Sequence, residues 1–184
     1  YEISECLVGS EMCIRDRFIV SGAPNTGKST TVYHLCTYLL NLGYVKTDIP
    51  YNGKRYSTST SFPPILANDF SCLLEKEGKK VLIHTATDDV FNIDALVNSI
   101  NNHKPSIVIT TCRDFGDWPR DYFCSQLKLV NSFILASTSD IDIEEFPLSR
   151  ITRRTTRFAT AYEWYFINST HQIEKILSLP PYSI

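Results

Sequence analysis

The stretch Gly22-Ala23-Pro24-Asn25-Thr26-Gly27-Lys28-Ser29 decides the fold of this chain. A short apolar, mostly β-branched run, Phe18-Ile19-Val20, leads directly into it, and a segment with helical periodicity follows. Its two glycines let the backbone curl so that several N–H groups point into one concavity. A lysine and a serine come next, at the start of the expected helix, where the helix dipole and the free N–H groups attract an anion. The stretch therefore predicts a strand–loop–helix unit that binds phosphate groups.

The segment after the loop has the pattern of a helix that packs on a sheet. Its apolar residues recur at intervals of three and four, and they end near a glycine, which is typical of a helix C-terminus. The apolar stripe consists of Val32, Leu35, Cys36, Leu39 and Leu40, and Gly43 follows it. Farther along, strand-like runs alternate with helical patterns, which predicts α/β organisation.

The remaining elements are expected in alternation along the chain. A polar, turn-rich segment at 46–64 predicts a loop or an irregular flap. The segments 69–74 and 80–85 flank Glu77-Gly78 and favour a hairpin over a short helix that leads into a strand. Further strands are expected at 106–111, 132–136 and 164–167, and helices near 93–101, 119–128, 148–163 and 172–179.

The loop matches the pattern G-x-x-x-x-G-K-S, and through it the chain resembles the P-loop nucleoside triphosphatase superfamily. The resemblance implies a three-layer α/β fold with a mostly parallel central sheet of about five strands. It also implies that ATP or GTP binds with Mg²⁺, with Lys28 reaching the β- and γ-phosphates and Ser29 ligating the metal. The residues expected around the nucleotide are Gly22, Ala23, Pro24, Asn25, Thr26, Gly27, Lys28, Ser29 and Thr30.

Residues 1–17 resemble a translated sequencing adapter, codon by codon from Tyr1 to Asp16 and through half of Arg17. We therefore treat 1–17 as a non-native segment and expect 18–184 to form a single nucleotide-binding domain. Without that segment the basic and acidic residues balance, so the formal charge changes from −2 to zero. The overall charge then predicts neither a nucleic acid nor a membrane surface as a partner.

The cysteines after residue 17 show no C-x-x-C pair and no histidine pairing typical of zinc. They are Cys36, Cys72, Cys112 and Cys124. No apolar run approaches the length of a membrane span. We therefore expect a cytoplasmic protein with reduced, buried thiols.

A magnesium site also needs a carboxylate, which P-loop proteins place at the end of the strand beside the loop strand. Asp88 and Asp89 follow the apolar run 81–83 at about that place, and they are the expected metal ligands together with Ser29. Asp114 is the next candidate, and Asp69 is a third if its segment forms a strand beside the loop. A solvated loop residue or a helix N-cap is the alternative role for each carboxylate.

An arginine-rich segment near the C-terminus predicts a basic helix face at the site. Such a face neutralises the negative charge that phosphoryl transfer spreads over the γ-phosphate. Helical spacing relates Arg150, Arg153, Arg154 and Arg157, and the last three join Lys28 as the expected catalytic residues. A solvated basic surface and contacts with a nucleic-acid backbone are the alternatives.

Three other polar residues are expected near the carboxyl edge of the sheet. Arg113 and Arg120 either bind an anionic substrate or lie on the surface. His84 sits close to the expected phosphate end, where a core or hydrogen-bonded role is favoured for it.

Two branches of the superfamily resemble different parts of the chain. The C-terminal third, with a basic helix, a short strand and a terminal helix, resembles small-molecule kinases. The middle resembles small GTPases, because a hairpin ends in Thr85-Ala86-Thr87-Asp88-Asp89. We expect an ATP-dependent, kinase-like phosphotransferase that acts with Mg²⁺ on an unidentified small-molecule acceptor. The alternatives are a GTPase-like or ATPase switch that recruits a protein partner, and a nucleic-acid-associated ATPase.

Overall fold

The computed structural model describes residues 16–24, 26–50, 69–114, 116–127, 142–147, 169–180 and 182–184, with Asp16 and 142–147 described by their backbone alone. Several predicted elements lie outside these residues. They are most of the flap at 46–64, the strands at 132–136 and 164–167, and the basic helix at 148–163.

Among the described residues, six strands form one open sheet in the order β2-β3-β4-β5-β1-β6. Their bounds are Asp16–Ser21 for β1, Val45–Asp48 for β2, Ser71–Lys76 for β3, Lys79–His84 for β4, Ile107–Cys112 for β5 and Asp142–Pro147 for β6. β4, β5, β1 and β6 run parallel, whereas β3 is antiparallel to both β2 and β4. The α/β class is confirmed, and the sheet is wider than the expected five strands because antiparallel strands extend one side.

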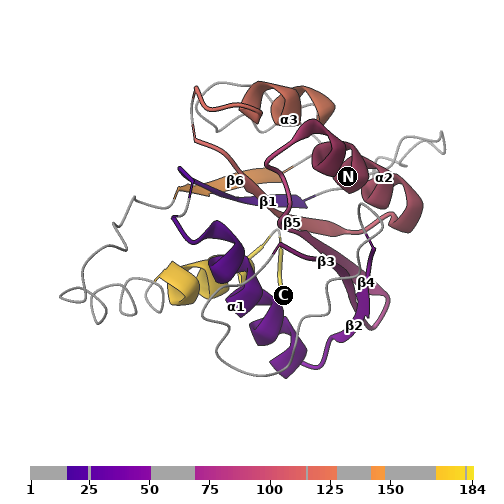
Figure 1. Cartoon of the computed structure of the whole chain (residues 1–184). Helices are drawn as coiled ribbons and strands as arrows, with labels where there is room; N and C mark the ends of the chain where they lie inside the picture. The colour runs from indigo at the N-terminus through magenta and orange to yellow at the C-terminus, as the bar shows by residue number, and fades with distance from the viewer. Residues whose placement is uncertain are drawn as a thin grey trace, which may run out of the picture.

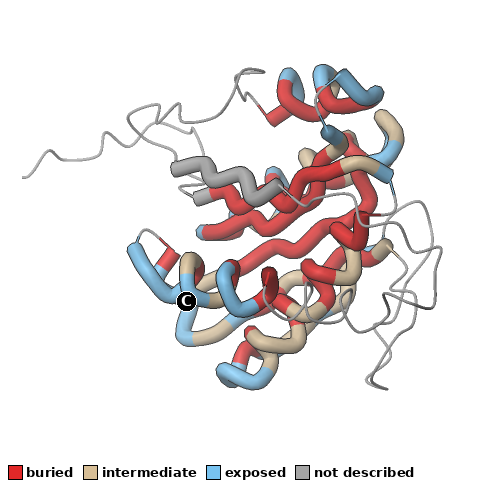
Figure 2. Tube along the Cα trace, turned by 90° about the vertical axis from the view of Figure 1, so that its left-hand side faces the viewer, coloured by how far each residue is buried: buried red, intermediate tan, exposed pale blue. Residues whose placement is uncertain are grey.

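Helices cover both faces of the sheet, so the described residues form three layers (Figure 1). α1 (Lys28–Asn41) and a C-terminal helix at 169–177 pack on one face, and α2 (Val90–His103) and α3 (Arg120–Gln126) pack on the other. Phe18 and Val20 of β1 face α1, whereas Ile19 faces α2 and α3. β5 is therefore buried along its whole length, and β4 from Val81 onwards, as Figure 2 shows.

Local sequence patterns predicted most of these elements. β3 and β4 form the expected hairpin around Glu77-Gly78. α2, α3, β5 and the helix at 169–177 lie within three residues of their predicted bounds. α1 ends at Asn41, and Gly43 then adopts φ +90°, a conformation that favours glycine.

The two edge strands differ from the prediction. The prediction of a loop over 46–64 is wrong at its start, because Val45–Asp48 forms β2. β6, Asp142–Pro147, was not expected at all, and half of its residues are acidic. Edge strands pair on one side only and carry charged residues that discourage further pairing, so they lack the continuous apolar run that marks a central strand.

β1 begins two residues before the expected Phe18. Asp16 and Arg17 pair with β5 and β6 through their backbone. The Arg17 side chain is buried, burial lowers its pKa, and its Nη1 donates to the carbonyl of Leu127. The strand backbone therefore extends into the segment that resembles adapter sequence.

The cysteines after residue 17 are all free and buried, as expected. Cys36 Sγ of α1 and Cys72 Sγ of β3 lie 3.9 Å apart, so α1 crosses the sheet from β1 towards β3. No helix in the described parts of the chain has the length and apolar character that crossing a membrane requires.

β1 and β5 are parallel neighbours whose following helices lie on opposite faces of the sheet. α1 follows β1 on one face, and α3 follows β5 on the other (Figure 1). Open α/β sheets bind ligands in the crevice that such a divergence opens at the carboxyl ends of the strands. The stretch from Gly22 to Ser29 leaves β1 at this point.

Candidate functional site

The turn from β1 into α1, residues 22–27, is called the glycine loop below. Gly22 has φ +151° and Gly27 has φ +94°, and residues with a Cβ rarely adopt such positive φ angles. The Gly22 N–H donates to the carbonyl of Cys112 at 3.2 Å, and the Thr26 hydroxyl closes the turn on the Ala23 carbonyl at 2.9 Å. Pro24 lies between them, and Asn25 is outside the described residues. Both glycines are thus required by the backbone path, as the pattern predicted.

Lys28 folds back over the glycine loop from the first position of α1. Its Nζ donates to the carbonyls of Gly22 at 2.9 Å and Ala23 at 3.1 Å, and the residue is only 8% exposed. Burial lowers the pKa of Lys28, and the nearby charge of Asp88 opposes that shift. A buried ammonium held over a loop of backbone N–H groups is suited to an anionic ligand.

The N-terminus of α1 has no side-chain cap. Gly27 is the N-cap residue, and the first turn contains no acidic side chain. The first N–H groups of a helix have no partner within the helix, so they favour an anion from elsewhere. Lys28, Ser29 and Thr30 form this first turn.

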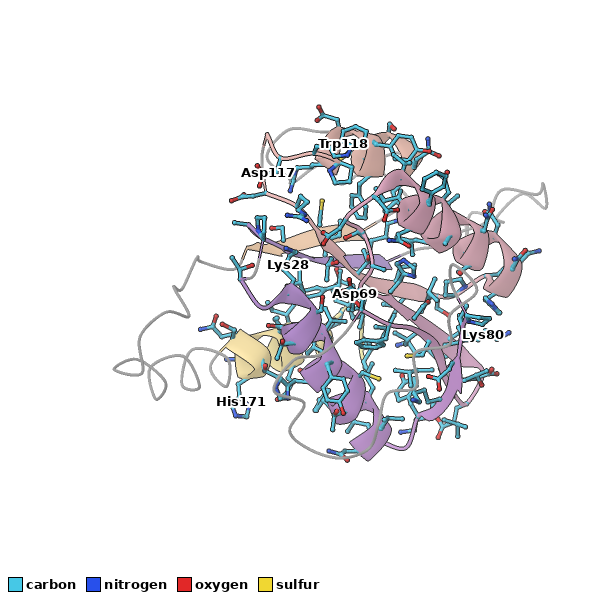
Figure 3. All side chains as sticks on the ribbon, viewed as in Figure 1. Lys28, Asp69, Lys80, Asp117, Trp118 and His171 are labelled. Atoms are coloured by element: carbon cyan, nitrogen blue, oxygen red, sulfur yellow. The ribbon has the colours of Figure 1, made fainter. Side chains whose placement is uncertain are left out.

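Ser29 and Asp69 bring two hard oxygen atoms together beside this helix end. The Ser29 hydroxyl donates to Asp69 Oδ1 at 2.7 Å. Burial raises the pKa of Asp69, and the hydrogen bond from Ser29 opposes that shift. Figure 3 shows Lys28 and Asp69 close together where α1 meets the sheet. Because Mg²⁺ prefers oxygen ligands and usually takes only one or two carboxylates from the protein, this pair fits a magnesium site.

Asp69 reaches the carboxyl edge of the sheet because it precedes an antiparallel strand. β3 starts at Ser71 and pairs with β4 in the opposite direction, so its beginning lies beside the end of β4. The Phe70 N–H donates to Thr85 Oγ1 at 2.8 Å, and Thr111 Oγ1 donates to the Thr85 carbonyl at 2.7 Å. These bonds tie the segment that carries Asp69 to the ends of β4 and β5.

Asp88 and Asp89, the carboxylates predicted as metal ligands, have other partners in the structure. Asp88 Oδ1 accepts from Arg113 Nε at 2.7 Å. Asp89 is the N-cap of α2 and accepts from the Asn92 backbone N–H at 2.9 Å. The strand that leads to them, β4, was expected beside β1, but β5 occupies that place. Asp114 follows β5 on the loop between β5 and α3.

The sequence did not predict a structural role for the buried threonines around Thr85. Thr85, Thr87, Thr110 and Thr111 are all buried at the ends of β4 and β5. Thr87 Oγ1 and Thr111 Oγ1 lie 2.9 Å apart, and Thr110 Oγ1 donates to the His84 carbonyl at 2.8 Å. Threonines just after the apolar run of β4 and near the end of β5 are the signal that would have pointed to them.

His84 has the buried, hydrogen-bonded role that was expected. It is fully buried, and its Nε2 lies 2.8 Å from the Ala86 carbonyl. Burial lowers its pKa to about 4, so the ring is neutral near pH 7. Arg120 is also buried, and its Nη1 donates to the Arg113 carbonyl at 2.8 Å.

The predicted catalytic arginines Arg153, Arg154 and Arg157 lie outside the described residues, as does Arg150. The structure therefore brings together the glycine loop, Lys28, Ser29 and one carboxylate, Asp69, that ranked behind Asp88 and Asp89 in the prediction. The described residues contain no group of three or more histidine, cysteine, aspartate or glutamate side chains that could hold a metal ion. A magnesium ion here would rely on Ser29, Asp69 and ligand oxygens.

Comparisons with protein-family models, with curated proteins and with solved structures found no match for this chain.

Proposed function

We propose that this protein is a P-loop phosphotransferase that binds a nucleoside triphosphate with Mg²⁺ and transfers its γ-phosphate. The observation that carries the proposal is the 2.7 Å hydrogen bond between Ser29 and Asp69 beside the uncapped start of α1. P-loop enzymes hold Mg²⁺ through the serine or threonine of the loop and an aspartate. The proposal thus rests on a pair of side chains as well as on the sequence pattern.

In this proposal the glycine loop and the first turn of α1 bind the phosphates through their backbone N–H groups. Lys28 exchanges its bonds to the carbonyls of Gly22 and Ala23 for phosphate oxygens. Phosphate favours the charged lysine, because a nearby negative charge offsets the burial that lowers the Lys28 pKa.

Ser29 and Asp69 would hold Mg²⁺, which neutralises charge on the β- and γ-phosphates. Burial raises the pKa of Asp69, and a cation at its oxygens counteracts that effect by favouring the carboxylate. The protein's part is to position these groups before the ligand arrives, which lowers the cost of ordering them during the reaction.

The kinase-like assignment depends on the acceptor. Arg153, Arg154 and Arg157 are the residues that the sequence predicts beside the transferring group. If water is the acceptor, the same site hydrolyses the triphosphate, so the reaction has to be measured with and without added acceptors.

Ligand-dependent thermal stabilisation tests nucleotide binding directly. ATP and GTP are added with Mg²⁺ to the protein, to Lys28→Ala and to Lys80→Ala, which removes a lysine near the start of β4, at the other end of the sheet (Figure 3). Loss of the Lys28 contacts should weaken binding on the order of tenfold to a hundredfold, since hydrogen bonds to charged groups contribute about 1.5–3 kcal/mol. Lys80→Ala should keep the full shift.

A melting temperature that neither nucleotide raises would contradict nucleotide binding by the unaltered protein. Equal shifts in the unaltered protein and Lys28→Ala would show that the ligand binds elsewhere. For bound nucleotide, phosphate release alone indicates hydrolysis, and faster turnover with one of a panel of small hydroxyl acceptors indicates a kinase.

A further inference from the structure

We propose that Arg113 contacts the terminal phosphate of a bound triphosphate, and that Asp88 is the counter-ion that holds Arg113 in the absence of that phosphate. The inference rests on the proposed function and goes beyond it by assigning the recognition of the third phosphate to one residue. It also gives Asp88 a role different from the metal ligand that the sequence predicts.

Arg113 lies beside the first residue of the glycine loop. In the parallel pairing of β1 with β5, Ser21 is the partner of Cys112, so the next residues along the two strands are Gly22 and Arg113. The Gly22 N–H donates to the Cys112 carbonyl at 3.2 Å, which continues the pairing up to the loop. Neighbouring strands are about 4.8 Å apart, so an arginine side chain at this position is long enough to reach over the loop.

Among the described residues, the backbone and the side chain of Arg113 have different partners. Arg120, which is 3% exposed, donates from Nη1 to the Arg113 carbonyl at 2.8 Å. The Arg113 side chain bonds to Asp88 Oδ1 through Nε at 2.7 Å. The side chain can therefore change partners without movement of the main chain.

The ion pair with Asp88 is weak enough for a phosphate to replace it. The Asp88 side chain is 53% exposed and the Arg113 side chain 18%, so water reaches the pair from the Asp88 side, and exposed ion pairs contribute only about 0.2–1 kcal/mol. Arginine binds phosphate through two parallel hydrogen bonds, which are stronger than a single contact with an exposed carboxylate. Once released, Asp88 returns to water at little cost because it is already largely solvated.

Lys28 and Arg113 both lie at the start of the glycine loop. Lys28 Nζ donates to the Gly22 carbonyl at 2.9 Å, and Arg113 is the residue beside Gly22 along the pairing of β1 with β5. When Arg113 moves from Asp88 to a phosphate, its guanidinium exchanges one negative partner for another. This exchange makes Arg113 a residue that distinguishes a triphosphate from a diphosphate.

The test compares ATP with ADP, or GTP with GDP, at fixed Mg²⁺ by isothermal titration calorimetry. The proteins are the unaltered chain, Arg113→Gln, Arg113→Lys, Asp88→Asn and the double variant Asp88→Asn/Arg113→Gln. Glu75→Gln and Lys80→Gln are matched controls that each remove one charge towards the other end of the sheet, where the two residues pair across β3 and β4. Thermal unfolding without ligand verifies that each variant is folded.

Arg113→Gln should lower the affinity for ATP about tenfold and leave that for ADP unchanged, because one charge-assisted contact with the third phosphate is lost. Arg113→Lys should recover only part of the preference for ATP, since it lacks the planar fork. Asp88→Asn should raise the affinity for ATP up to about fivefold, because Arg113 no longer has to leave a partner. In the double variant this gain should disappear.

An unchanged ratio of ATP to ADP affinity in Arg113→Gln would overturn the inference. Weaker or unchanged ATP binding in Asp88→Asn would overturn the role of Asp88, and weaker binding would favour the metal ligand that the sequence predicts. These failures are distinct from failure of the proposed function, in which the unaltered protein binds neither nucleotide. Binding that Lys28→Ala abolishes, with no effect of Arg113→Gln, would leave the proposed function standing and remove only this inference.

Discussion

The helices α1 and α2 begin at the same edge of the sheet, but their N-termini are completed in different ways. At α2 the carboxylate of Asp89 accepts from the Asn92 N–H at 2.9 Å, so the helix supplies its own cap. At α1 the N-cap is Gly27, with no side-chain cap and no acidic residue in the first turn. The difference agrees with the proposed function, in which an anion from outside the chain takes the place of the missing cap at α1.

The carboxylates near the two helix N-termini also differ in whether the fold itself uses them. Asp89 caps α2, whereas Asp69 is only partly buried, burial raises its pKa, and its Oδ1 accepts from the Ser29 hydroxyl at the start of α1. Residues that hold a ligand often lower the stability of the ligand-free protein, because their charges lack a full partner until the ligand binds. The comparison therefore predicts opposite effects of substitutions at the two ends.

Asp69→Asn should have the largest effect. Nucleotide binding in the presence of Mg²⁺ should weaken about tenfold or more, since the variant loses the charge that would hold the metal. The ligand-free variant should be more stable than the unaltered protein near pH 7. The raised pKa means that the folded state binds a proton more tightly than the unfolded state, so stability falls as the pH rises from the ordinary value of 3.8 through the folded value.

Two measurements check this prediction. Thermal unfolding of the ligand-free proteins at pH 4 and pH 7 tests the stability, and nucleotide titrations with and without Mg²⁺ test the binding. Unchanged Mg²⁺ dependence in Asp69→Asn would remove Asp69 from the proposed metal site. A lower stability at pH 7 would show that its charge is compensated in the free protein.

Gly27→Ala should have the next largest effect, on the uncapped end of α1. The residue has φ +94°, where a Cβ costs about 1–2 kcal/mol, so the melting temperature of the free protein should fall. Nucleotide binding should weaken as well, because the new residue displaces the loop that presents the N–H groups. A variant that keeps both its stability and its nucleotide affinity would contradict the conformational role of this glycine.

Asp89→Ala should have the smallest effect, at the capped end of α2. Loss of the cap should cost about 1 kcal/mol of stability, measured by chemical denaturation, with little change in nucleotide affinity. Asp89→Asn is the matched variant, because asparagine caps a helix as well as aspartate does but carries no charge. Weaker Mg²⁺-dependent binding in Asp89→Asn would restore the metal-ligand role that the sequence predicts.

The sequence predicts the β1–loop–α1 unit because that unit is determined by neighbouring residues. The glycines at 22 and 27, the apolar stripe of α1 and the hairpin around Glu77-Gly78 all act over a few residues, and the structure contains each of them. The edge strands β2 and β6 escape prediction because partners distant in sequence form them.

The sequence does not predict which carboxylate lies beside Ser29, because that position depends on strand order. The P-loop pattern favours the acidic residues that follow the apolar run of β4, on the expectation that this strand adjoins β1. Instead β5 lies between them, and Asp69 reaches Ser29 by preceding an antiparallel strand that α1 crosses. Neither the order of strands nor the path of α1 can be read from local periodicity.

The most direct measurement is an amide NMR titration of the protein with Mg²⁺ and ATP or GTP. The comparison predicts large shifts for the backbone N–H signals of Gly27, Lys28 and Ser29 at α1, and a nearly constant signal for Asn92, whose N–H is already bonded to Asp89. Lys28→Ala should suppress the shifts at α1. Signals at α1 that stay constant, or that move no more than that of Asn92, would contradict the claim that α1 carries the anion site.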